Sequence, residues 1–161
     1  MAEFLEIYQQ YAQPLYRFLL SLSGSEDWAE ELLQETFFQA YQHISKFEGR
    51  CNLYTWLCQI GKNAWIKEYH RNKRYKSVSL DDLPLSVVGP SPEEQFIAKE
   101  EYRKIQTAIQ ELPNPYRDVF ILHAIGNIRL KEIAYLHQKT ESWARVTYFR
   151  AKQMIQQEVS K

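Results

Sequence analysis

Several features that define common classes of protein are scarce in this chain of 161 residues. It has two cysteines, Cys51 and Cys58, so no disulfide framework beyond one bridge is possible, and this usage is typical of a reducing cytosol. No run of about 18 apolar residues is present and no signal peptide is apparent, so we expect a cytoplasmic protein without membrane insertion. The four histidines are scattered, which argues against a zinc site.

A glycine-rich loop of the kind that cradles phosphates is also missing. With no plausible metal cluster either, nothing in the sequence favours an enzyme that acts on nucleic acid. We therefore predict a non-enzymatic protein with no catalytic residues, no metal and no cofactor. The hydrophobic content of 45% and the zero formal net charge indicate a globular chain and not a disordered one.

Charge is distributed in four alternating blocks. Residues 1–35 carry a net charge of −6, residues 36–80 carry +6, residues 81–111 carry −4 and residues 112–161 carry +4. Each basic block follows an acidic one, which predicts two kinds of partner surface.

Almost every segment has the periodicity of an amphipathic helix, so the predicted fold class is all-α. A first helix is expected over about 4–22, bent near Pro14. Gly24 and Ser25 separate it from a second helix over about 27–45, with Ser25 or Asp27 as its cap.

The second expected helix has two faces. Its apolar stripe is formed by Leu33, Phe37, Ala40 and Ile44. Another side carries Glu31, Gln34, Glu35 and Phe38. An acidic face beside an aromatic ring suits a basic partner helix, although a solvated charged face is the commoner case.

A basic and aromatic helix follows a loop over 47–53. Basic side chains neutralise phosphates and aromatic faces stack on unpaired bases, so this helix is suited to gripping an opened strand. The alternative is a core helix whose lysines are merely solvated. Spacing places Trp56 on the same side as Ile60, towards the core, and places Trp65 and Tyr69 elsewhere around the helix.

Residues 77–91 contain prolines, serines and an acidic pair, which predicts a linker. Ser91, Pro92 and Glu94 form a capping signal for a helix that ends at Leu112 and Pro113. A further helix begins near Asn114 and ends at Gly126.

The last segment has a helix-turn-helix pattern, in which the second helix enters the major groove of DNA. Residues 138–141 form the turn, and small residues at Ala134 and Ala144 allow the two helices to cross closely. The stripe expected to be buried on the second helix is Ala144, Tyr148, Ala151 and Ile155.

These pieces together resemble the extracytoplasmic-function class of bacterial RNA polymerase sigma factors. The resemblance covers nearly the whole chain. It rests on AEELLQETFFQAYQHISKF at 29–47, YTWLCQIGKNA at 54–64, LPNPYRDVFIL at 112–122, and EIA at 132–134 with RAK at 150–152.

The resemblance implies two small helical domains, over 1–76 and 92–161, joined by a flexible linker over 77–91. The first would bind the β′ clamp helices of core RNA polymerase and melt the minus-ten promoter element. The second would meet the β flap and read the minus-thirty-five element of promoter DNA with its helix-turn-helix. An anti-sigma factor is implied as a further partner.

The same resemblance gives three sets of residues a role by position. Polymerase binding is implied for Glu31, Gln34, Glu35 and Phe38. Minus-ten recognition is implied for Arg50, Asn52, Leu53, Tyr54, Lys62, Asn63, Trp65, Lys67, Tyr69 and Arg71. Minus-thirty-five recognition is implied for Ser142, Trp143, Arg145, Val146, Phe149 and Arg150.

Two features depart from the family pattern. Gln138 and Lys139 stand where the turn is expected to have a glycine and an apolar residue. Trp143, Val146 and Phe149 make the outer face of the last helix unusually apolar, and such a face needs a cover. The major groove, an inhibitory partner, or folding back of Trp143 and Phe149 onto neighbouring helices would each provide one.

The main alternative function is a stand-alone helix-turn-helix regulator of transcription. Such a protein binds duplex DNA without polymerase, so affinity for an isolated duplex at physiological salt would favour it. The acidic face of the second helix and the aromatic residues suited to melting favour the sigma factor.

Overall fold

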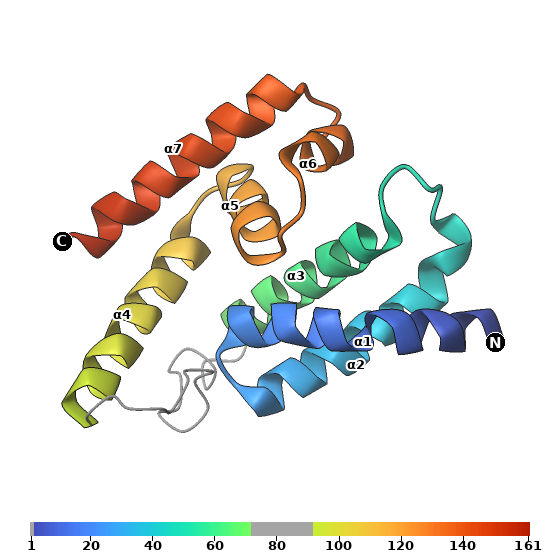
Figure 1. The fold of residues 1–161 in the computed structure, drawn as a ribbon, viewed down its shortest axis with the longest axis horizontal. Helices are drawn as coiled ribbons and strands as arrows, with labels where there is room; N and C mark the ends of the chain where they lie inside the picture. Colours follow the sequence, from blue (N-terminus) through green and yellow to red (C-terminus); the bar gives the residue numbers. More distant parts are fainter. Residues whose placement is uncertain (1, 72–91) are drawn as a thin grey trace.

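The computed structural model describes residues 2–71 and 92–161, and all of the regular structure in these two ranges is helical (Figure 1). The predicted all-α class is therefore confirmed. The expected linker over 77–91, its Ser91 cap and the domain boundary at 76 lie outside the described residues.

The N-terminal half contains α1 (Ala2–Ser23), α2 (Glu26–His43), the short 3-10 helix η1 (Ile44–Lys46) and α3 (Leu53–Arg71). Gly24 ends α1 with a φ of 70°, a left-handed conformation that costs glycine little. Ser25 then caps α2, because its Oγ accepts a hydrogen bond of 3.2 Å from the backbone N–H of Trp28. The predicted break between the first two helices is confirmed.

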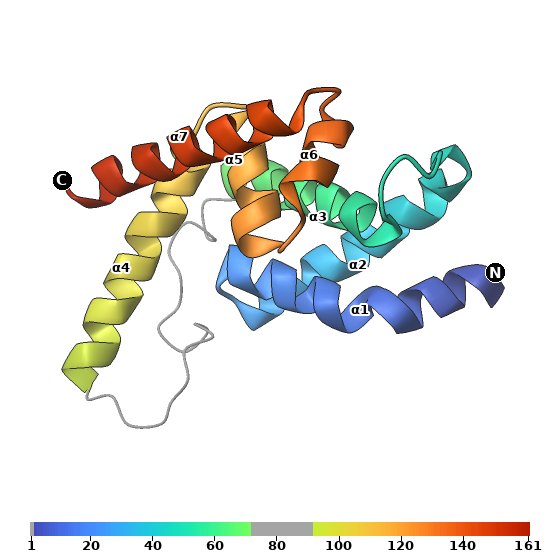
Figure 2. The same cartoon turned by 45° about the horizontal axis from the view of Figure 1, so that its top comes forward.

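The C-terminal half contains α4 (Pro92–Glu111), α5 (Tyr116–Phe120), a π-helical turn η3 (Ile121–Ile125), α6 (Leu130–Leu136) and α7 (Glu141–Val159). The predicted helix limits at Pro92, Pro113 and Gly126 are confirmed. Figures 1 and 2 show α5 and η3 between α7 on one side and the N-terminal half on the other. The C-terminal half therefore packs directly on the N-terminal half.

The stripe that α2 buries is wider than the sequence indicated. Its buried members are Trp28, Ala29, Leu32, Thr36, Phe37 and Ala40. Phe37 and Ala40 were predicted, whereas Leu33 and Ile44 are only half-buried. The correction arises because α2 packs against both α1 and α3, and its N-terminal end faces α3 through Trp28.

The buried side of α3 differs from the predicted one. Trp65 and Tyr69 are buried, with ring centroids 6.5 Å and 6.4 Å from that of Trp28. Trp56 is half-buried against Phe47, at a ring distance of 5.2 Å. The prediction that placed Trp56 in the core and the other two elsewhere was wrong, because the core of α3 follows a different phase of the helical repeat.

Close packing joins α1 to the C-terminal half. A Cβ atom at Gly126 would lie 2.8 Å from the carbonyl oxygen of Leu122 and 3.3 Å from Cε1 of Phe18 in α1. The backbone carbonyl of Leu22 accepts a hydrogen bond of 2.5 Å from Nε2 of Gln106, and that of Ser21 accepts one from the Tyr102 hydroxyl. The last carbonyls of α1 thus find donors in α4.

Residues 130–159 form the predicted helix-turn-helix. Ala134 of α6 and Ala144 of α7 are buried, as the predicted close crossing requires. The Oγ1 of Thr140 caps α7 by accepting a hydrogen bond of 3.1 Å from the N–H of Trp143. Gln138 has a φ of 57°, so a glutamine adopts the left-handed conformation for which a glycine was expected.

We predict that Trp65→Ala lowers the free energy of unfolding by about 3–5 kcal/mol, because it removes a fully buried indole that packs on Trp28. Trp56→Ala should cost less, since its ring is only half-buried. Urea denaturation of both variants measures the difference. Equal losses in the two variants would contradict this assignment of the core.

We also predict that Gln138→Gly raises the free energy of unfolding by about 0.5–1 kcal/mol, because it relieves a left-handed non-glycine residue. Lys139→Gly is the matched control at the adjacent turn position, which is also exposed but has no positive φ. Thermal unfolding followed by circular dichroism compares them. The prediction fails if both substitutions change stability equally.

Candidate nucleic-acid interface

The face of α2 that was predicted to bind polymerase is available on the surface. Glu31, Gln34, Glu35 and Phe38 are all exposed, and the ring of Phe38 is 58% exposed. Oε1 of Glu35 accepts a hydrogen bond of 2.8 Å from Nε2 of Gln39, one turn further along the helix. An exposed aromatic ring beside carboxylates can accept a partner that is both apolar and basic.

The loop before α3 is shaped by its own polar groups. Asn52 caps α3, because its Oδ1 accepts a hydrogen bond of 2.8 Å from the N–H of Tyr54. The Arg50 side chain is exposed and forms an ion pair of 2.8 Å with Glu48. Leu53 is half-buried. This loop presents Arg50 and Asn52 outward, as a base-capturing loop would require.

Less of the Tyr54 side chain is available to a DNA strand than the sequence suggested. Its ring stacks on that of Tyr11 with centroids 6.1 Å apart, and its hydroxyl donates a hydrogen bond of 3.3 Å to the carbonyl of Pro14. Tyr54 therefore ties the start of α3 to α1 and is half-buried.

The outer face of α3 retains part of the predicted minus-ten set. Asn63, Lys67 and Arg71 are exposed and follow one another at helical spacing, in line with Trp56 and Ile60. Lys67 and Arg71 also line a hollow of about 320 Å³ between α2 and α3, whose opposite wall includes Glu31 and Glu35. The proposed basic and acidic surfaces therefore meet at this hollow.

Three other members of that set are not accessible. Lys62, Trp65 and Tyr69 are buried, so none of them offers a surface to a DNA strand in this arrangement, and their role in minus-ten recognition stays a prediction. Trp65 and Tyr69 belong to the core of the N-terminal half, where they pack on Trp28. Lys62 has no exposed surface, because the C-terminal half covers it.

Lys62 is paired with an acid from the other half of the chain. Its Nζ lies 2.8 Å from Oδ1 of Asp118 in α5, and Nε2 of His137 lies 3.9 Å from Oδ2 of the same carboxylate. One carboxylate is thus flanked by two groups that can carry positive charge.

The protonation of these three groups reflects that arrangement. Burial lowers the pKa of Lys62, and the charge of Asp118 opposes this effect. Burial would raise the pKa of Asp118, but its interactions with His137 and Lys62 outweigh burial and lower the pKa to about 2. The interaction with Asp118 raises the pKa of His137 above its usual value. Asp118 is therefore ionised at neutral pH.

A second acid, Glu132 of α6, meets the start of α3. Its Oε1 accepts hydrogen bonds from the backbone N–H of Asn52, at 2.6 Å, and from Oγ1 of Thr55, at 2.8 Å. Asp118, Glu132 and His137 were absent from the predicted sites. Cys58, Lys62, Trp65 and Tyr69 follow one another at steps of four, three and four, so they share one side of α3. This spacing could have indicated that the charge of Lys62 is buried. The neighbouring sequence does not identify the acid that pairs with it.

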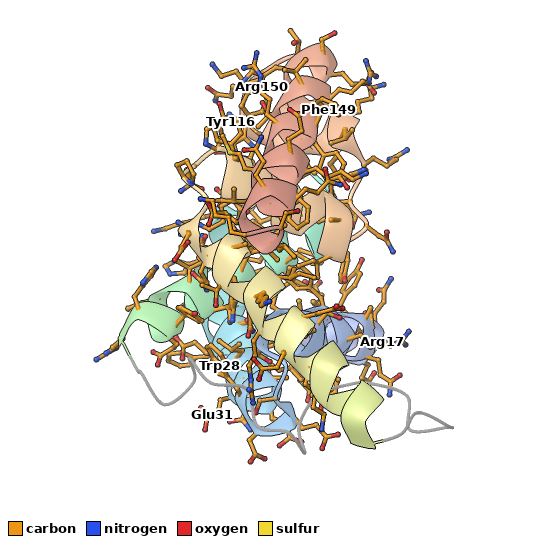
Figure 3. All side chains as sticks on the ribbon, turned by 90° about the vertical axis from the view of Figure 1, so that its left-hand side faces the viewer. Arg17, Trp28, Glu31, Tyr116, Phe149 and Arg150 are labelled. Atoms are coloured by element: carbon orange, nitrogen blue, oxygen red, sulfur yellow. The ribbon has the colours of Figure 1, made fainter. Side chains whose placement is uncertain are left out.

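The outer face of α7 carries the predicted minus-thirty-five residues. Ser142, Arg145, Val146, Phe149 and Arg150 are exposed, with Phe149 at 60%. Figure 3 shows Phe149 and Arg150 at the opposite end of the molecule from Glu31 on α2.

Trp143 behaves differently from its apolar neighbours. It is half-buried, its ring lies 5.5 Å from that of His137, and Nζ of Lys139 lies 5.9 Å from its centroid. Of the covers considered for this face, folding back therefore applies to Trp143 and not to Val146 or Phe149.

In the two described ranges, no group of three or more His, Cys, Asp or Glu side chains is arranged to hold a metal ion. Nor is any helix in those ranges both long and apolar enough to span a membrane.

Two family models match the chain, one in each half. Residues 7–75 match sigma-70 region 2, and residues 102–155 match sigma-70, region 4. The two matches fall on α1–α3 and on α4–α7.

Among similar proteins is the ECF RNA polymerase sigma factor SigM of Bacillus subtilis, 35% identical over 153 residues, which cover 93% of this chain and 91% of that protein. The ECF RNA polymerase sigma factor SigX of the same organism is 27% identical over 154 residues, with 92% and 79% covered.

Two solved structures share the fold. CnrH, in complex with the cytosolic domain of CnrY, has a TM-score of 0.62 and 17% identity, with 98% of this chain and 87% of that chain covered. The sigma factor RpoE of Bartonella quintana, in complex with the anti-sigma factor NepR, has a TM-score of 0.59 and 20% identity, with 99% and 98% covered.

Proposed function

The chain belongs to the extracytoplasmic-function family of RNA polymerase sigma factors, and on that basis we propose which of its surfaces perform each step of promoter-specific initiation. It is a transcription initiation factor that binds core RNA polymerase and directs it to specific promoters. Since sigma factors are not catalysts, we assign the chain no reaction of its own, and we place it in the cytoplasm with the polymerase.

One observation carries the assignment of surfaces. Exposed sets of opposite character lie on α2 and α7, with carboxylates on α2 and arginines on α7. Carboxylates repel phosphates, so the α2 face, with Glu31, Glu35 and Phe38, suits a protein partner, which is the clamp of core polymerase. The α7 face, with Arg145 and Arg150, suits the duplex at the minus-thirty-five element.

The minus-ten element meets the loop before α3 and the outer face of this helix. Arg50 and Asn52 are exposed in the loop, and Asn63, Lys67 and Arg71 are exposed along the helix. Positive charge along one face tracks a phosphate backbone, while the loop receives an unpaired base.

A protein inhibitor is a further proposed partner. RpoE of Bartonella quintana forms a complex with the anti-sigma factor NepR. On the present chain, Val146 and Phe149 form an exposed apolar pair that such a partner can cover when transcription is off.

Run-off transcription with core polymerase on genomic fragments tests the proposed function. Discrete transcripts that require both this protein and core polymerase are the expected result. Tight binding to isolated duplex at physiological salt, without such transcripts, would instead identify a stand-alone regulator.

We predict that Glu31→Lys and Glu35→Lys each weaken binding to core polymerase, because charge reversal at an interfacial pair costs about 2 kcal/mol or more. Glu111→Lys is the matched control, since it changes the net charge equally at an exposed position at the end of α4. A pull-down with core polymerase compares the variants. Unchanged affinity of both α2 variants would exclude this face.

We predict that Val146→Ala and Phe149→Ala change base preference in a randomised minus-thirty-five selection, because apolar side chains contact thymine methyl groups in the major groove. Arg150→Ala should weaken binding to all sequences if it contacts phosphate. Gln157→Ala, exposed near the end of α7, is the control. Unaltered preference in the first two variants would exclude groove reading and favour the inhibitor as the cover.

A further inference from the structure

A polar cleft of about 740 Å³ lies between α1 and the residues that join η3 to α6. The start of α3 and the residue before it form a third wall, through Asn52, Tyr54 and Thr55. The volume is within the range of about 300–1,000 Å³ that is usual for pockets that bind small molecules. Apart from Asn52 and Tyr54, the residues that line this cleft belong to none of the sites predicted from the sequence.

The three walls of the cleft are held in place by contacts within the chain. Gly126 lies against α1, where a Cβ atom would be 3.3 Å from Cε1 of Phe18, and Figures 1 and 2 show the end of η3 beside this helix. The Tyr54 hydroxyl donates a hydrogen bond to the carbonyl of Pro14, and Glu132 accepts two hydrogen bonds at the start of α3. The cleft is therefore preorganised, so a ligand loses little affinity to ordering of the protein.

Two arginines line the cleft without an acid to neutralise them. Arg17 belongs to α1 and Arg129 immediately precedes α6, so they come from different walls. Both residues are exposed, and neither forms an ion pair with an acid in residues 2–71 or 92–161. Arg17 makes one long contact, in which its Nη2 lies 3.4 Å from the neutral Oε1 of Gln13. The exposed arginines that do pair with an acid are Arg50, Arg71 and Arg145.

This arrangement suits an anion with more than one charged group. A guanidinium group binds a phosphate or a carboxylate through two parallel hydrogen bonds. Two guanidinium groups from different walls can therefore bind two such groups of one ligand. Glu132 is the one acid among the described residues that line the cleft, and its Oε1 is already bonded at the start of α3. Two arginines against one acid leave the cleft with an excess of positive charge.

The rest of the lining suits a polar ring system. Gln10 and Asn127 are exposed, and each side-chain amide offers both donors and an acceptor, as the edge of a nucleobase does. Tyr11 is half-buried in the wall, where its ring stacks on that of Tyr54 with centroids 6.1 Å apart. Nucleobases stack on aromatic side chains. A ligand that uses both parts of the cleft has phosphates and a base, as a nucleotide does.

A free nucleotide fits this position better than a nucleic-acid strand. The helix α1 lies in the block of residues 1–35, whose net charge is −6. A strand that continued beyond the cleft along α1 would bring further phosphates towards these acids, which repel them. A free nucleotide has no phosphates outside the cleft, so it meets the two arginines without this repulsion.

We propose that this cleft binds a free nucleotide with more than one phosphate, whose phosphates are held by Arg17 and Arg129 and whose base meets Gln10 and Asn127. The site shares Asn52 with the promoter contacts proposed above, but its ligand is a small molecule and not a strand. Binding is measured without polymerase or promoter DNA, so the result does not depend on the proposed function.

Three variants of the full chain test the phosphate contacts. Arg17→Ala and Arg129→Ala each remove one guanidinium group from the cleft. Lys104→Ala is the matched control, since it removes one positive charge at an exposed position of α4 outside the cleft. All three positions are exposed, so we expect the fold to be retained, and circular dichroism checks this. If one arginine variant fails to fold, the other tests the same contact.

Binding is followed by the fluorescence anisotropy of ATP that carries a fluorophore on its ribose. We expect saturable binding to the wild type, displaced by unlabelled ATP or GTP. Affinity should be on the order of tenfold lower in Arg17→Ala and Arg129→Ala, because each loses charge-assisted hydrogen bonds, and unchanged in Lys104→Ala. Inorganic triphosphate should compete more weakly than ATP, because it lacks the base.

Several results would contradict the proposal. Without saturable binding at millimolar nucleotide there is no such site, and an equal loss in Lys104→Ala would show a general effect of charge. Equal competition by inorganic triphosphate and ATP would show that the base is not recognised. Stronger competition by a single-stranded oligonucleotide than by ATP would assign the cleft to a strand. Run-off transcription with the wild type tests the proposed function separately, so either proposal can fail without the other.

Discussion

A buried positive charge governs how the two halves of this protein fit together. The ammonium of Lys62 is withdrawn from water in the middle of α3, and the carboxylate of Asp118 is the charge that compensates it. Loss of one partner from such a pair typically costs about 3–5 kcal/mol, whereas the intact pair contributes little net stability. The pair therefore fixes the position of α5 on α3 more than it stabilises the fold, and it also places α6 at the start of α3.

Local signals in the sequence were sufficient for the helices. Pro92, Pro113, Gly126 and the Ser25 cap define ends that depend only on neighbouring residues, and the structure has those ends. The phase of α3 was not predictable in the same way. Its two candidate stripes both contain aromatic residues, and the choice between them depends on Trp28, which reaches α3 from another helix.

The candidate site residues also differ in whether local sequence was enough to predict their exposure. Except for the half-buried Trp143, the residues named on α2 and α7 lie on exposed faces, because each face is opposite the buried stripe of its own helix. The minus-ten set was only partly accessible, for two reasons. Trp65 and Tyr69 pack on Trp28 of α2, and Lys62 is paired with Asp118, which lies more than 50 residues further along the chain. Spacing identified Lys62 as a basic residue on an aromatic helix, but spacing carries no information on what packs over it.

The acids of the C-terminal half divide into two that contact α3 and two that form ion pairs on the surface. Residues 112–161 contain four acids in a block of net charge +4. Asp118 and Glu132 are directed at α3, whereas Glu141 and Glu158 form exposed ion pairs with Arg145 and Lys161. An acid directed inward removes negative charge from the outer surface while it compensates the positive groups of α3. The two acids that contact α3 thereby leave the outer surface of the C-terminal half more basic, which suits its proposed contact with duplex DNA.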